Sequence, residues 1–385
     1  MHNGNNKIKI NDVSNEAKHS LVSRLIVSVV LLIIVLPCII LGDYVFMGLA
    51  LICSLLSAYE ICKAPQSIEK KFNNIIFVFA FFMMILMVFW TFSRRLIDSY
   101  LLHEYTPANK NLPFTYNIYT GFSSPTISLS AFVICMVFFF LMVLIDKSFT
   151  IHDAFYFIGM LFIVSLGYQT LMYLRLYPSY AISTAISYNE SLFNQGEVMK
   201  ITQEELDSLK ALLNDPWYKY GESALLFIYM CLGTLVTDAG AYLTGMLFGK
   251  HKLCPRISPK KTVEGFVGGI IFSIVITLTF AFSLVFTGHP IVYGLLDREH
   301  WYFILIISLL MPFVSSFGDL LFSCVKRGYQ VKDFGRILKS HGGILDRVDS
   351  VLVTSILLGL IIPLFNEIYI IRNKWVNWKD HFKSI

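Results

Sequence analysis

Long uncharged apolar segments recur along this chain and restrict what it can fold into. Residues 25–41, 75–92, 128–145 and 266–287 contain no charged side chain, and with their flanks they reach the roughly 18 residues that a helix needs to cross a membrane. The whole chain is 56% hydrophobic and 15% charged, whereas soluble domains average about 25% charged residues. A soluble core could not enclose so much apolar surface. We therefore predict an all-α fold, a polytopic transmembrane helical bundle.

The hydropathy pattern predicts about nine spans, which divide the chain into four regions. We place the spans at 24–42, 45–60, 74–92, 127–145, 153–174, 223–248, 264–287, 301–322 and 349–371. Residues 1–23 are expected to form a cytosolic N-terminal tail, and 24–222 an N-terminal transmembrane region with two extracytoplasmic loops, 94–126 and 176–222. Residues 223–371 are expected to form a catalytic transmembrane region with cytosolic loops 249–263 and 323–348. Residues 372–385 form a C-terminal tail.

The distribution of basic residues predicts the orientation in the membrane. With the N-terminus in the cytosol, the cytosolic segments collect 19 of the 31 Lys and Arg residues and the opposite side receives 12. This asymmetry agrees with the positive-inside rule. The C-terminal tail is the exception, because its four basic residues fall on the outer side.

The N-terminal residues argue against a cleaved signal peptide, and the cysteines argue against a disulfide framework or a zinc site. The first twenty residues or so are polar, and the apolar run after them is too long for a signal-peptide core, so we expect a retained first helix. The seven cysteines contain no CxxC pair and mostly lie in apolar segments. We expect them to be reduced packing residues, forming neither a disulfide framework nor a zinc site.

Ionisable residues crowd into two stretches of the last 160 residues, and the first of them surrounds Asp238. It comprises Thr237-Asp238-Ala239-Gly240-Ala241-Tyr242, Gly249-Lys250-His251-Lys252 and Ser258-Pro259-Lys260-Lys261-Thr262-Val263-Glu264-Gly265. A carboxylate within an apolar helix costs about 3 kcal/mol on insertion scales, which favours a functional role for Asp238. A structural hydrogen bond between helices is the alternative.

The second stretch runs from Asp319 to Asp349. It contains Ser323, Lys326-Arg327, Lys332-Asp333, His341-Gly342-Gly343 and Asp346-Arg347-Val348-Asp349. Asp346 and Asp349 are three residues apart, so they share a face if they open the last helix. Asp319 comes from the end of the preceding helix. We therefore expect three carboxylates to converge at one membrane-surface pocket among basic residues.

Interleaved carboxylates and basic residues are typical of a metal–nucleotide site. Carboxylate oxygens hold Mg²⁺, which keeps phosphate oxygens as further ligands, while Lys and Arg neutralise the triphosphate. The Gly342-Gly343 pair would let the backbone approach a phosphate closely. The alternative is a cytosolic loop whose Asp and Lys side chains pair in solvent.

These residues also resemble a known family. Ser323-Cys324-Val325-Lys326-Arg327, Lys332-Asp333-Phe334-Gly335 and the segment from His341 to Ser350 closely resemble the signature of phosphatidate cytidylyltransferases, also called CDP-diacylglycerol synthases. The stretches 238–242 and 258–266 resemble that family's second motif. The resemblance is strong over about 230–350 and rests on hydropathy elsewhere. One departure is Lys339-Ser340, where the family usually has Pro-Gly, and it changes the local turn.

The resemblance implies a reaction, a cofactor and roles for individual residues. A phosphate oxygen of phosphatidic acid would attack the α-phosphorus of CTP, pyrophosphate would leave, and Mg²⁺ would be required. Asp319 and Asp346 are the first choices as Mg²⁺ ligands, with Asp349 and Asp238 as second choices. The predicted catalytic residues are Asp319, Asp346, Lys326 and Arg327, and the predicted substrate-binding residues are Lys260, Lys261, Lys332, Ser323, His341 and Arg347. His341 could equally stabilise a turn, and Ser323 could equally cap or back-bond to its helix.

Two other functions remain open at the level of sequence. A CTP-dependent lipid kinase of the dolichol-kinase kind would transfer the γ-phosphoryl group and release CDP. A transporter would use Asp238 as an ion site, but no internal hydropathy repeat is visible.

The expected partners are CTP, phosphatidic acid and the bilayer, with no nucleic acid, and a homodimer is left open. The motif wording favours a bacterial plasma membrane, with the endoplasmic reticulum as the alternative.

Overall fold

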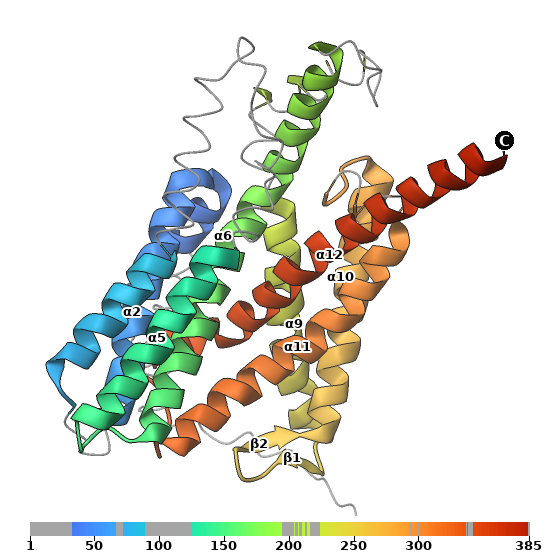
Figure 1. Cartoon of the computed structure of the whole chain (residues 1–385). Helices are drawn as coiled ribbons and strands as arrows, with labels where there is room; N and C mark the ends of the chain where they lie inside the picture. The colour runs from blue at the N-terminus through green and yellow to red at the C-terminus, as the bar shows by residue number, and fades with distance from the viewer. Residues whose placement is uncertain are drawn as a thin grey trace, which may run out of the picture.

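The computed structural model shows a bundle of long helices (Figure 1). It describes residues 33–66, 72–88, 125–194, 224–292, 295–296, 298, 300–335, 337 and 342–383, with isolated positions 204, 207, 210, 211, 214 and 215. The longer helices are α2 (Asp43–Gln66), α5 (Pro125–Ile145), α6 (Ile151–Asn194), α9 (Leu225–Phe248), α10 (Val263–Thr287), α11 (Trp301–Gly328) and α12 (Leu345–Lys383). Shorter helices cover 33–41 and Asn74–Val88.

The all-α transmembrane fold expected from the sequence is confirmed. A helix occupies all or part of each predicted span that the structure describes. Five helices of the described part are long and apolar enough to cross a membrane: Tyr44–Pro65, Ile151–Leu176, Leu225–Phe248, Val263–Thr287 and Trp301–Gly328. Much of their surface carries large apolar side chains exposed on the outside of the bundle, as contact with lipid requires.

Four helices continue beyond their predicted ends, α2 and α11 by six residues and α6 and α12 by more than ten. Helix α6 reaches Asn194, well into the expected outer loop 176–222, and α12 reaches Lys383 instead of stopping at 371. Hydropathy reports where an apolar run ends, whereas a helix continues as long as its backbone hydrogen bonds do. A further difference lies in 249–263, where the expected loop contains an antiparallel hairpin of β1 (Lys252–Cys254) and β2 (Ser258–Thr262).

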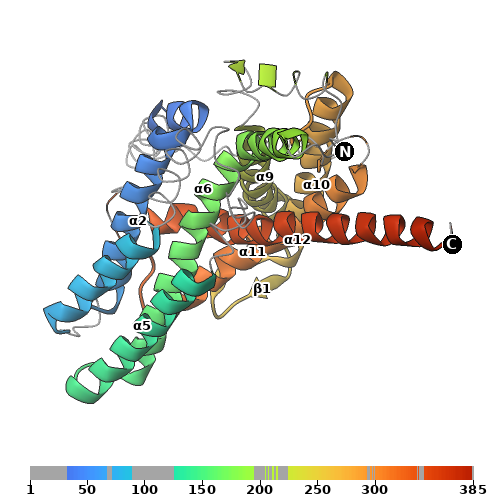
Figure 2. The same ribbon diagram turned by 45° about the horizontal axis from the view of Figure 1, so that its top comes forward.

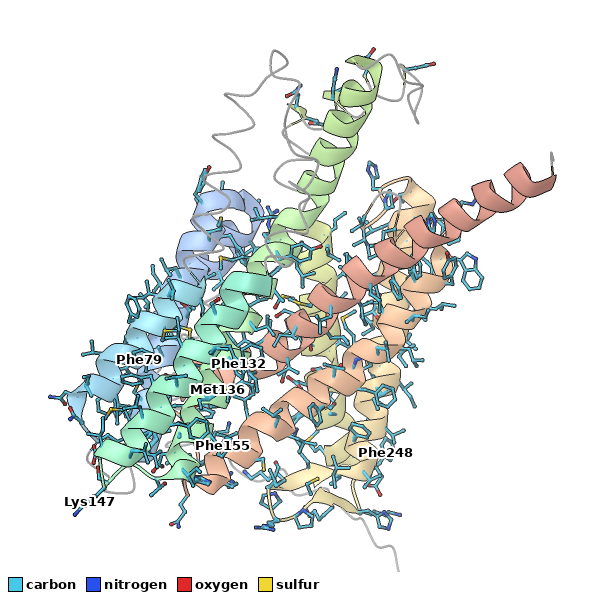
Figure 3. All side chains as sticks on the ribbon, viewed as in Figure 1. Phe79, Phe132, Met136, Lys147, Phe155 and Phe248 are labelled. Carbon is cyan, nitrogen blue, oxygen red and sulfur yellow. The ribbon has the colours of Figure 1, made fainter. Side chains whose placement is uncertain are left out.

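Helix α6 is the centre of the N-terminal half. Helices α2, α5 and α12 all pack against it, and Figure 2 shows α5 and α6 running side by side. Aromatic rings fill this part of the core, including the stacked pair Phe79–Phe138 and the tilted pair Phe132–Phe162. Figure 3 shows Phe79 and Phe132 among these helices.

Helices α9 and α10 form the tightest pair in the C-terminal half, because small residues face each other across their contact. A Cβ at Gly269 would lie 2.6 Å from the carbonyl oxygen of Thr237, and one at Gly240 would lie 3.2 Å from the Cα of Gly269. The Ser273 hydroxyl donates to the carbonyl of Gly233 at 3.0 Å across the same contact. Small residues let membrane helices approach closely, and here they bring Asp238 of α9 near the start of α10.

The loops expected on the cytosolic side lie together at one end of the bundle. The hairpin β1–β2 and the turn between α5 and α6 share the end opposite the C-terminus (Figure 1). Lys147, after α5, and Phe248, at the end of α9, both lie toward that end in Figure 3. Hydrogen bonds from Arg327 to Ile257 and from Tyr329 to Asp153 join the end of α11 to the hairpin and to α6. The predicted site loops are therefore neighbours in space.

Candidate active site

A cavity of about 360 Å³ lies at this end of the bundle, between α9, β2, the start of α10 and α11. Its charged lining consists of Asp238, Lys260, Lys261 and Asp319. Most of the remaining lining is apolar and includes Tyr242 and Met246, which are 70% and 62% exposed on the surface of α9. The cavity therefore combines charged lining residues with an apolar rim, formed by Tyr242 and Met246 on the outer surface of the spanning helix α9.

An ion pair crosses the cavity. The Nζ of Lys261, at the end of β2, lies 2.6 Å from Oδ2 of Asp319 in α11, and the two side chains are 28% and 29% exposed. The hydroxyl of Ser323, one turn further along α11, donates to Oδ1 of Asp319 at 3.3 Å. Asp319 thus accepts from two predicted site residues while remaining reachable from the cavity.

Carboxylates from three helices lie within electrostatic range of one another. The charge of Asp319 acts on Asp238 in α9 and on Asp349 in the first turns of α12, and Lys261 offsets part of it at Asp238. Asp349 is 8% exposed, and its Oδ1 accepts from the backbone amide of Ser350 at 2.7 Å. Hard carboxylate oxygens grouped around one cavity are a donor set that suits Mg²⁺.

This grouping is not a preformed metal site in the part of the chain that the structure describes. Among those residues, no three His, Cys, Asp or Glu side chains are close enough together to hold an ion. The fit to Mg²⁺ therefore rests on the chemistry of the carboxylates beside basic residues. Asp238 and Asp319 are the two carboxylates that line the cavity.

Asp346 occupies a different environment from Asp319. Its Oδ1 accepts from Nζ of Lys326 at 2.8 Å, and the two side chains are 6% and 10% exposed. Its Oδ2 accepts from the backbone amides of Phe334 at 2.9 Å and Gly343 at 3.0 Å. Asp346 therefore joins α11 to the loop before α12, and it does not line the cavity that contains Asp319.

The other predicted residues divide between structural contacts and exposed positions. Arg327 donates to the carbonyls of Ile257 at 3.2 Å and Val331 at 3.0 Å, and so ties the hairpin to the end of α11. Lys260 is exposed and lines the cavity, whereas Lys332 and Arg347 are exposed on the surface. His341 and the Lys339-Ser340 departure lie outside the described residues.

Local sequence explains how β2 and α10 present the two lysines. Thr262 caps α10 by accepting from the amide of Gly265 at 3.1 Å, a common way to begin a helix. Glu264 accepts from the backbone amides of Lys250 and His251 and lies 2.6 Å from Nδ1 of His251. These contacts hold the hairpin against the start of α10, and Lys260 and Lys261 immediately precede the cap.

One residue of this region was missed by sequence reasoning. Glu60 of α2 is fully buried, and its two carboxylate oxygens accept from the amides of Ile344 at 2.9 Å and Leu345 at 2.8 Å. A Cβ at Gly343 would lie 2.5 Å from both of these oxygens. The space at Gly343, which we expected to admit a phosphate, is therefore bordered by Glu60. A charged residue in an otherwise apolar span was the available signal.

The chain is similar to known proteins of one family. A family model described as the cytidylyltransferase family matches residues 22–365. A phosphatidate cytidylyltransferase of Staphylococcus saprophyticus is 44% identical over 138 residues, which are 36% of this chain and 48% of that protein. One of Bacillus subtilis is 45% identical over 138 residues, or 36% and 47% of the two chains. One of Staphylococcus haemolyticus is 41% identical over 135 residues, or 35% and 48%. The chain spans about half the length of these relatives.

Proposed function

Because the chain belongs to the cytidylyltransferase family, we propose that it transfers the CMP group of CTP to phosphatidic acid and so makes CDP-diacylglycerol and pyrophosphate. The relatives carry the name phosphatidate cytidylyltransferase. The observation that carries the proposal is the cavity in which Lys261 meets Asp319 beside Asp238, next to an apolar rim. Such a cavity offers an anionic nucleotide and a lipid headgroup a common site.

The chemistry suits a site without a separate general base. A phosphate oxygen of phosphatidic acid is already an anion, so it can form the new bond to the α-phosphorus without losing a proton to the protein. The bond from the α-phosphorus to the bridging oxygen breaks, and pyrophosphate takes the electron pair. Charge repulsion and positioning then dominate the barrier, as in other phosphoryl transfers. Lys260 and Lys261 reduce that repulsion by neutralising phosphate charge at the cavity.

Magnesium is the cofactor that we propose for this site. Asp319 and Asp238 would hold the ion, which supplies positive charge to the phosphate oxygens. Asp349 would add negative charge near the ion without lining the cavity, since it is buried and its charge interacts with that of Asp319. Asp346 stays a candidate ligand from the sequence. Its present partners, Lys326 and two loop amides, give it a second role in shaping the loop.

The lipid is proposed to enter from the side of the bundle. Tyr242 and Met246 form the exposed edge of the cavity on α9, where the bilayer would lie. We further propose that this end of the bundle faces the cytosol, because the segments that we predict to be cytosolic, which include both site loops, contain 19 of the 31 Lys and Arg residues. The division at about residue 222 into an N-terminal and a catalytic region belongs to the same proposal, as do Lys326, Arg327, Lys332, Ser323, His341 and Arg347 as site residues.

The test is to identify both products. Purified protein is incubated with phosphatidic acid, Mg²⁺ and CTP labelled in the α-phosphate, and the lipid and nucleotide fractions are separated. Label in CDP-diacylglycerol together with released pyrophosphate supports the proposal. Release of CDP with a phosphorylated lipid would instead identify a CTP-dependent lipid kinase. Ion or solute flux without any lipid product would identify a transporter.

A further inference from the structure

The loop between α11 and α12 carries several of the proposed site residues, and the N-terminal half of the chain holds both of its ends. The described parts of this loop are 329–335, 337 and 342–344, and they include Lys332. Asp346 follows in the first turn of α12. The cavity described above is built without α2 or α6, so contacts from these helices to the loop require a separate explanation.

Glu60 holds the C-terminal end of the loop. It caps α12 by accepting from two successive amides, those of Ile344 and Leu345, which would otherwise lack a partner in the helix. A carboxylate at a helix N-terminus is also favoured by the helix dipole. One oxygen of Asp346, Oδ2, accepts from the amides of both Gly343 and Phe334. Glu60 and Asp346 together therefore bind the three consecutive amides of Gly343, Ile344 and Leu345, and Asp346 also binds the amide of Phe334.

The other end of the loop is held by α6. The hydroxyl of Tyr329 donates to Oδ1 of Asp153 at 3.1 Å, and its ring lies 4.5 Å from the ring of Tyr156. Burial, and then the adjacent Asp153 carboxylate, raise the pKa of the Tyr329 phenol, so that it stays protonated and donates. Tyr156 in turn donates to the carbonyl of Ile61 at 2.9 Å, one residue after Glu60. The C-terminal part of α2 thus supports both ends of the loop.

We propose that Glu60 is a positioning residue that sets the conformation of the α11–α12 loop and thereby the placement of Lys332 and Asp346. Its role in turnover rests on the proposed function. The role in positioning rests on the contacts alone: a fully buried carboxylate whose oxygens bind the loop amides and border Gly343. Removing its charge leaves the amides of Ile344 and Leu345 poorly satisfied, because an amide side chain presents only one acceptor oxygen.

The first experiment compares Glu60→Gln with Ser57→Ala. Ser57 lies one turn before Glu60 on α2, and its hydroxyl bonds to that of Tyr168 at 2.9 Å in the core, so its loss removes a buried contact of α2 without touching the loop. Hydrogen exchange in the peptide 342–350 should become faster in Glu60→Gln and stay unchanged in Ser57→Ala. The kcat/KM for CTP should fall roughly 10- to 100-fold in Glu60→Gln alone.

A second variant tests the same contact from the loop. Gly343→Ala places a methyl group against Glu60, whose atoms are the three nearest neighbours of that position. It should reduce CMP transfer when Glu60 is present and add little in a Glu60→Ala background, because contacting residues are not additive. If Glu60→Gln fails to fold, Gly343→Ala alone still tests the contact: hydrogen exchange at 342–350 should become faster and CMP transfer slower, and wild-type values of both would overturn the positioning role.

The outcomes separate the two proposals. Wild-type hydrogen exchange and turnover in Glu60→Gln, or additive effects of the two substitutions, would overturn the positioning role. Faster exchange at 342–350 in Glu60→Gln, together with no CDP-diacylglycerol from the wild-type protein, would support the positioning role and overturn the proposed function instead.

Discussion

The ammonium of Lys261 and the carboxylate of Asp319 meet at 2.6 Å, although 58 positions separate them in the chain. The first stands at the end of a β-hairpin and the second near the end of α11. Both line the cavity, together with Asp238. The pair thus holds a cation and an anion at the place where we propose that the nucleotide and Mg²⁺ bind.

Removing the charge of Asp319 should abolish most of the activity. Asp319→Asn keeps the size of the side chain but removes the charge that would offset the dication, so CMP transfer should fall about 100- to 1000-fold. The partial exposure of the ion pair predicts little change in thermal stability. Turnover is measured at saturating Mg²⁺, with Asp146→Asn, at the remote α5–α6 turn, as the control. Near-normal turnover would remove Asp319 from the metal site.

Asp346 should differ from Asp319 in its effect on stability. Asp346→Asn leaves the ammonium of Lys326 buried without its carboxylate, a loss that typically costs about 3–5 kcal/mol. We expect a lower thermal midpoint as well as lower activity. Lys326→Met in the same chain should restore part of the midpoint, because it removes the unpaired charge. If Asp319 and Asp346 also act on one ion, the double Asp→Asn variant will be little slower than either single one. Unchanged stability in Asp346→Asn would contradict the buried pair.

The close contact of α9 and α10 should be sensitive to a single methyl group. Gly269→Ala would place Cβ 2.6 Å from the carbonyl of Thr237, the residue before Asp238, so the helices must separate. Both the thermal midpoint and CMP transfer should fall. Gly159→Ala in α6 is the control, since its Cβ meets no atom within 4 Å and helix propensity favours alanine by up to about 1 kcal/mol. Equal behaviour of the two variants would argue against the close packing.

The orientation can be tested with one native cysteine. Cys254 in β1 is partly exposed, and in a chain whose six other cysteines are replaced it should react with an impermeant thiol reagent from the cytosolic side only. Thr287→Cys, exposed at the far end of α10, should react from the opposite side in a chain without other cysteines. Labelling of Cys254 exclusively from outside would reverse the proposed topology.

The sequence by itself determined the class of fold, and it singled out the residues that we propose carry the chemistry. Apolar runs long enough to span a membrane are unfavourable in water, and a soluble core could not enclose so many of them. Residues such as 266–287 therefore had to become membrane helices. The carboxylates of the C-terminal half were also easy to identify in the sequence, because Asp238 and Asp319 lie within apolar segments. The predicted helix ends at 174 and 371 were less accurate, since the hydrogen-bonded helix outlasts the apolar run.

Only the tertiary structure decided which charged side chains contact one another. Asp319 and Asp346 were both predicted to bind Mg²⁺, but packing directs Asp319 toward Lys261 in the cavity and Asp346 toward Lys326 and two loop amides. Glu60 lies 284 positions before Ile344, the residue whose amide it accepts from. Hydropathy and short motifs describe neighbours along the chain. The partner of a buried charge depends instead on which distant helices pack together, and this is set by the fold as a whole.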